Sequence, residues 1–182
     1  MELKDVEISL GIQFPKLFHE INNSGMTFFG EMMGDCQMIA FEELQSAYDD
    51  LYESLNFDLE IYPERQAINP RYRLVPFARR ISGDKYCFLY TRHQCEKPYM
   101  SPIPLPNCEA VEDEPKVVVY GHDTGDVDLW ANNFEEFIYF QIIEAVAEWD
   151  KPIRSDYIKA HILWLSDKHK QMLADHPINK LG

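Results

Sequence analysis

Residues 74–90 read LVPFARRISGDKYCFLY, and this stretch decides the fold. Two β-rich runs, 74–81 and 85–91, lie on either side of the polar tripeptide Ser82-Gly83-Asp84. Glycine accepts the positive φ that a tight turn requires, and aspartate hydrogen-bonds to the backbone of its own turn. The stretch therefore predicts an antiparallel β-hairpin, with Gly83 and Asp84 as structural turn residues.

On both sides of the hairpin, periodic apolar residues predict helices and further strands. We expect helices at 3–10, 15–21, 42–55, 133–149, 155–165 and 167–174. We expect the further strands at 36–41, 116–120 and 127–131. Gly11 is placed to end the first helix in a left-handed conformation, and Asn133 with Glu136 forms an Asn variant of the capping box. Because helices and strands occur in separate runs, this order predicts an α+β fold with a largely antiparallel sheet.

The length of 182 residues suits one domain. Residues 1–150 contain all the predicted strands and are expected to form the α+β domain. Residues 151–182 begin with a Lys-Pro pair and are mildly basic. We interpret them as a C-terminal helical extension that packs on the same domain.

The chain is strongly acidic, with a formal net charge of −14. Residues 1–63 carry thirteen acids against two bases, and residues 106–150 carry twelve acids against one base. Binding of nucleic acid or of an anionic membrane needs clustered Lys and Arg, so this balance disfavours both. A basic protein is the natural partner, because opposite charge accelerates encounter and selects partners. The alternative is that the acidity serves solubility alone.

The N-terminal sequence MELKDVEISLGI lacks the basic segment and apolar run of a secretory signal. No stretch is long and apolar enough to suggest a membrane span. In the absence of a signal sequence, reduced thiols are expected at the four cysteines, Cys36, Cys87, Cys95 and Cys108. These features favour a cytoplasmic location and leave the role of the cysteines open.

Motifs of common enzymes are absent: there is no GxxxxGK[ST], HExxH or GxSxG. His93, Cys95 and Cys108 offer three zinc ligands, but the paired CxxC spacing is missing and no fourth ligand stands out. His122 beside Asp123 offers a general base, although Asp and Gly also cluster in turns for backbone reasons. We therefore expect no enzyme activity, no catalytic residue, no metal and no cofactor, with these two constellations as the alternatives.

Acidic residues on the polar side of helix 42–55 and in the segment before strand 116–120 are candidate partner-binding groups. Two more aspartates lie near strand 127–131. Aromatic residues close to these acids are expected to anchor an interface, since aromatic side chains contribute strongly to binding energy. The candidate residues are Asp49, Asp50, Glu53, Tyr99, Glu109, Glu112, Asp113, Glu114, Asp126, Asp128 and Trp130. Our hypothesis is that the two acidic segments, residues 1–63 and 106–150, form one face of the protein.

The segments DVEISLGIQFPKLFHEINNSG, LVPFARRISGDKYCFLY, PKVVVYGHD and WANNFEEFIYFQI follow one another along the chain. In this order and spacing they resemble the SUKH superfamily of Smi/Knr type, over about residues 3–148. Phe14 stands where the family commonly has Leu or Ile. The insert at 96–115 and the tail after 150 are longer than the resemblance predicts, and both are candidates for partner-specific contacts.

The resemblance implies a sheet of about six strands with helices packed against it, and a non-enzymatic role. Bacterial members of the superfamily resemble immunity proteins that bind and neutralise toxins, often nucleases. For this chain the resemblance implies neutralisation of a cognate polymorphic toxin. The acidity of the chain predicts that this toxin is basic, and we expect the chain to act as a monomer or weak homodimer. Fungal members resemble cell-wall regulators, so the alternative is an intracellular scaffold or regulatory adaptor.

Overall fold

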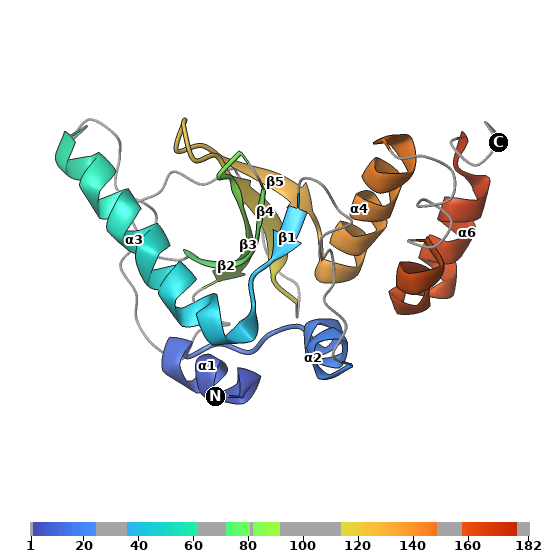
Figure 1. Cartoon of the computed structure of the whole chain (residues 1–182), viewed down its shortest axis with the longest axis horizontal. Helices are drawn as coiled ribbons and strands as arrows, with labels where there is room; N and C mark the ends of the chain where they lie inside the picture. Colours follow the sequence, from blue (N-terminus) through green and yellow to red (C-terminus); the bar gives the residue numbers. More distant parts are fainter. Residues whose placement is uncertain are drawn as a thin grey trace.

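The structure is a computed structural model of the whole chain, shown in Figure 1. It describes residues 2–24, 36–61, 72–80, 82–91, 114–148 and 158–177. Within these ranges, the side chains at 56, 58–61 and 148 are not described.

One antiparallel sheet forms the centre of the molecule, and its strands lie in the order β1-β2-β3-β4-β5. The strands are β1 (Cys36–Met38), β2 (Tyr72–Arg80), β3 (Lys85–Thr91), β4 (Lys116–Tyr120) and β5 (Val127–Ala131). Each strand pairs with the next one along the chain, so the described sheet is a simple meander. The predicted hairpin at 74–91 is confirmed as β2 and β3, with Val75 opposite Phe88.

The described residues contain five strands, so the expectation of about six was wrong by one. The apolar patterns in the sequence also predicted five strands, each from a run of its own. The sixth strand came from the family resemblance alone and had no pattern of its own in the sequence. The α+β class and the antiparallel arrangement are confirmed.

The helices begin and end close to the predicted positions. They are α1 (Leu3–Leu10), α2 (Lys16–Asn23), α3 (Leu44–Ile61), α4 (Phe134–Glu148) and α6 (Asp167–Asp175), with 3₁₀ turns η1 (Phe41–Glu43) and η3 (Ile162–Trp164). Gly11 ends α1 with φ 65°, in the left-handed conformation that glycine adopts readily. Asn133 caps α4, because its Oδ1 accepts the Glu136 N–H at 2.8 Å. Pro15 precedes α2 instead of forming its first residue, and α3 runs six residues beyond the predicted end at 55.

Helices cover both faces of the sheet (Figure 1). α3 packs on one face, while α2 and α4 pack on the other. Successive side chains of a strand point to opposite faces. Tyr86 and Phe88 therefore join the core under α4, whereas Cys87 and Leu89 join the core under α3. This double coverage explains why β3 is apolar without interruption from 86 to 90.

Aromatic rings fill the core between the sheet and α4. Phe77 and Phe88 lie on neighbouring strands and stack with their ring centroids 4.2 Å apart. Phe18 from α2 and Phe134 from α4 contact both of them edge-on. The aromatic residues of the SUKH-like segments thus meet at one point, where they join α2 and α4 to the hairpin.

α6 lies on the outer side of α4, away from the sheet (Figure 1). Leu165 and Leu173 are buried and belong to the same core cluster as the α4 side chains. The described part of the C-terminal segment therefore packs on the body of the protein. The division into a domain at 1–150 and an extension at 151–182 remains a prediction.

Candidate partner-binding surface

The outer face of α3 carries a row of exposed carboxylates. Leu44, Leu51 and Leu55 are buried against the sheet, and they define the inner side of the helix. Asp49, Asp50 and Glu53 are exposed and lie on the opposite side, as a period of 3.6 residues requires. The α3 acids, defined as these three residues, share one surface. No labelled helix or strand lies outside α3 in Figure 1.

A chain of two hydrogen bonds joins α1 to the first of these acids. Ser9 Oγ donates to Gln45 Oε1 at 2.8 Å. Gln45 Nε2 donates in turn to Asp49 Oδ1 at 3.1 Å. These bonds restrict the rotamer of Asp49 and hold α1 beside the start of α3. The carboxylate is therefore oriented before a partner binds, which lowers the entropic cost of binding.

The acids of the β4–β5 hairpin lie elsewhere. Asp128 pairs with Val119, and paired residues of an antiparallel sheet point to the same face. Val119 packs against the core on the α4 side, so Asp128 projects from the face opposite α3. Asp126 is exposed in the turn itself, where Thr124 Oγ1 accepts its N–H. The hypothesis of one continuous acidic face therefore does not hold for the described acids.

Trp130 is half-buried and contacts Tyr86 edge-on, with the ring centroids 5.4 Å apart. It lies at the margin of the core under α4, so much of its ring already has a partner within the fold. Glu114 lies close enough to Glu135 of α4 for the two charges to interact. Burial raises the pKa of the Glu114 carboxyl, and the charge of Glu135 raises it further. Neither residue lies beside the α3 acids.

Several predicted residues lie outside the described ranges. They are Tyr99, Glu109, Glu112 and Asp113 of the partner surface, and His93, Cys95 and Cys108 of the zinc hypothesis. The other two cysteines, Cys36 and Cys87, are buried. Burial raises the pKa of the Cys87 thiol, which keeps it protonated at neutral pH.

The Gly-Asp turn contacts the His-Asp turn at the same end of the sheet. Gly83 has φ 98°, and a Cβ at this position would lie 3.1 Å from His122 Cγ. Asp84 Oδ1 accepts the His122 N–H at 3.0 Å, while Asp84 Oδ2 accepts the Ser82 hydroxyl. The hydrogen bond from His122 lowers the pKa of Asp84, outweighing the opposing effect of partial burial. The geometry gives Gly83 and Asp84 a role in joining two turns.

His122 and Asp123, the alternative general-base pair, form a 3.0 Å contact through His122 Nδ1. Both side chains are largely exposed. Among the described residues, no group of three or more His, Cys, Asp or Glu side chains is arranged to hold a metal ion. The described helices also include none with the length and apolar character needed to cross a membrane.

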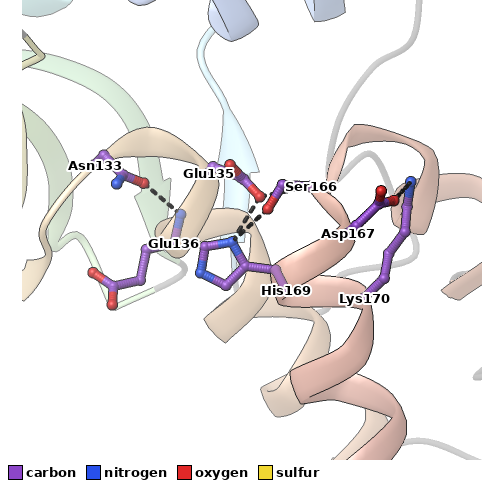
Figure 2. Close-up of polar contacts among 7 residues, drawn as sticks. All are labelled: Asn133, Glu135, Glu136, Ser166, Asp167, His169 and Lys170. Atoms are coloured by element: carbon purple, nitrogen blue, oxygen red, sulfur yellow. Dashed lines mark hydrogen bonds and ion pairs between the residues drawn. The ribbon is translucent and has the colours of Figure 1, made fainter.

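A cluster that the sequence analysis missed joins α4 to α6 (Figure 2). Glu135 Oε1 accepts the Ser166 N–H at 2.6 Å and lies 2.6 Å from His169 Nδ1. Burial works to raise the pKa of Glu135, but the hydrogen bonds from Ser166 and His169 outweigh it and the pKa is lowered.

Ser166, His169 and Glu135 do not form a catalytic relay. Ser166 Oγ lies 3.5 Å from His169 Nδ1, and Glu135 contacts that same nitrogen. In a relay the nucleophile and the carboxylate use opposite nitrogens of the ring. We therefore assign the cluster to packing of α6 on α4.

The sequence analysis also missed Phe57, which lies on α3. It follows Leu55 by two residues, so it lies off the buried stripe, and its side chain is 60% exposed. A helical projection of 44–61 would have revealed this position. The junction of Glu135 with Ser166 and His169 had no comparable signal, because 31 and 34 residues separate its members.

Comparison with known protein families supports the resemblance that the order of the sequence segments indicates. Searches among curated proteins and among solved structures give no significant match. The model of the SMI1 / KNR4 family (SUKH-1) matches residues 1–139, a range that includes all five strands. On this evidence, the chain belongs to the SMI1 / KNR4 family (SUKH-1).

Proposed function

We propose that this chain is a non-catalytic immunity protein, which binds a basic toxin domain and neutralises it in the cytoplasm. Membership of the SUKH-1 family is consistent with a protein-binding role of this kind. The observation that carries the proposal is the outer face of α3, where Asp49, Asp50 and Glu53 are exposed together. The protein acts as a monomer or weak homodimer and needs no cofactor.

Electrostatics supports a basic partner. The net charge of −14 attracts a basic protein over a distance of about 10 Å at moderate salt. Toxins that cleave nucleic acids carry basic surfaces, because their substrate is a polyanion. An acidic protein that covers such a surface blocks access of the substrate. Attraction of this kind acts mainly on the association rate and weakens as salt increases.

The first experiment is affinity capture from a lysate of the cells that naturally make this protein. The bait is the purified wild-type chain, and bound proteins are eluted with increasing salt. A single basic protein that elutes at high salt, and whose toxic activity the purified chain then inhibits, supports the proposal. Recovery of several host proteins without a toxin contradicts it and favours a scaffold or adaptor role.

A charge-reversed variant tests the surface itself. Replacing Asp49, Asp50 and Glu53 by lysine is expected to slow association with the toxin by about tenfold or more at low salt. The control reverses three exposed acids on α2 and α6, namely Glu20, Asp167 and Asp175. Both variants change the net charge by the same amount. Equal association rates for the two variants would show that the α3 acids are not the binding surface.

A further inference from the structure

Phe57 interrupts the acidic outer face of α3 with an exposed aromatic ring. Its side chain is 60% exposed. Among the described Phe, Tyr and Trp residues, it is the one whose side chain is largely exposed. It makes no contribution to the core clusters, which α3 joins through Leu44, Leu51 and Leu55. Its place on the surface therefore has no explanation in packing of the described fold.

Helical geometry places Phe57 in line with two of the α3 acids, one turn beyond Glu53. Glu53 precedes it by four residues and Asp50 by seven, so the three lie in one stripe along the helix. Side chains of an α-helix lean toward its N-terminus, which brings the Phe57 ring over the turn that carries Glu53. The exposed face thus combines a flat apolar ring with carboxylates on the same side.

This combination suits one cation better than others. A guanidinium group is planar, stacks on aromatic rings and forms two parallel hydrogen bonds with a carboxylate. A lysine ammonium is compact and strongly hydrated, so it gains less from a ring beside a carboxylate. Aromatic residues surrounded by polar groups are also typical anchors of protein interfaces.

We infer that the outer face of α3 is a docking surface for an arginine of the partner protein, which stacks on Phe57 and pairs with Asp50 or Glu53. The inference rests on the proposed function, since it names the group of the basic partner that this face recognises. The negative charge of the chain and the exposed α3 acids complement the positive charge of this arginine. Phe57 supplies the preference for arginine over lysine.

Two synthetic peptides test the inference on the full-length chain. Each contains six cationic residues between neutral flanks, all arginine in one peptide and all lysine in the other. Affinities are measured by isothermal titration and by NMR shifts of the α3 amides, at low and at moderate salt. We expect the arginine peptide to bind about two- to fivefold more tightly, which is the effect of one exposed cation–π contact.

Variants identify the ring as the cause. Phe57→Ala and Phe57→Leu are both expected to lose most of the preference for arginine, because neither new side chain has a π face, although leucine remains apolar. Leu163→Ala is the control, since Leu163 is 72% exposed and lies in η3, away from α3. This variant is expected to keep the preference for arginine. Thermal melting checks that all three variants are folded.

Other results of these measurements would contradict either the preference for arginine or the assignment of the binding surface to α3. If wild type binds both peptides equally, or if Phe57→Ala keeps the full preference for arginine, the arginine inference is wrong while the acidic surface stands. If Phe57→Leu keeps the preference, stacking on the ring is not its cause and the inference is also wrong. If neither peptide shifts the α3 amides, both the inference and the assignment of the binding surface to α3 are wrong.

Discussion

Replacing Glu135 by alanine is expected to loosen α6 from α4. In the native protein, one oxygen of Glu135 lies 2.6 Å from both the Ser166 nitrogen and His169 Nδ1 (Figure 2). The substitution removes the acceptor of both groups. The His169 side chain is only 9% exposed, so water replaces the lost carboxylate poorly there.

The magnitude follows from the burial of the two partners. A hydrogen bond to a charged group contributes about 1.5–3 kcal/mol to stability. The Glu135 side chain is 26% exposed, so water compensates part of the loss and each bond is expected to contribute less than this range, at about 1 kcal/mol. The two bonds together then contribute about 2 kcal/mol. For a chain of this size, each kcal/mol lowers Tm by about 2–4 °C, so we expect a decrease of about 4–8 °C.

Urea unfolding and thermal melting, followed by circular dichroism, measure the loss of stability. Amide hydrogen exchange locates it, and the Ser166 amide and the amides of α6 are expected to lose protection before those of β3. Glu53→Ala is the control, because it removes an equal charge from an exposed site, and its effect is expected to stay within about 0.5 kcal/mol. If the two variants melt at the same temperature and the Ser166 amide keeps its protection, the junction does not hold α6.

Three further predictions concern pH, the hairpin turn and the buried thiols. Because the folded-state pKa of Glu135 is lowered, its contribution to stability is present above the ordinary value of 4.5 and is lost as pH falls below it. The stability difference between wild type and Glu135→Gln should therefore shrink on acidification, and a constant difference would contradict this. Gly83→Ala should destabilise the fold by about 2 kcal/mol in urea unfolding, because φ is positive and His122 Cγ lies 3.1 Å from the new Cβ; an unchanged midpoint would show that the turn adapts freely. Cys36 and Cys87 should react with a thiol reagent at least about tenfold faster in urea than in the native state, as followed by site-resolved mass spectrometry, and fast native labelling would show that they are accessible.

The hairpin and the helix ends were predictable because their causes lie within a few residues. The turn chemistry of Gly83 and Asp84 marked the β2–β3 connection, and Gly11 marked the end of α1. Val-rich residues marked β4 at its observed bounds. The strand count failed at the one point where it relied on a resemblance instead of a pattern in the chain.

The candidate site was predictable only in part. The exposure of the α3 acids followed from the period of the helix, and the structure bears out that geometry. The expectation that Asp128 would share a face with them was wrong, because pairing with Val119 directs it to the α4 side. The register of a strand decides which face a residue occupies, and a single residue of shift reverses it.

The sequence by itself determined the local elements, the acidity and the order of motifs that identifies the SUKH-1 family. These properties depend on neighbours along the chain or on composition, so they can be read without coordinates. Only the tertiary structure decided that Asp128 lies on the face opposite the α3 acids and that Glu135 joins α4 to α6. Those relations depend on how layers stack and on contacts between residues more than thirty positions apart, and no local pattern encodes such contacts.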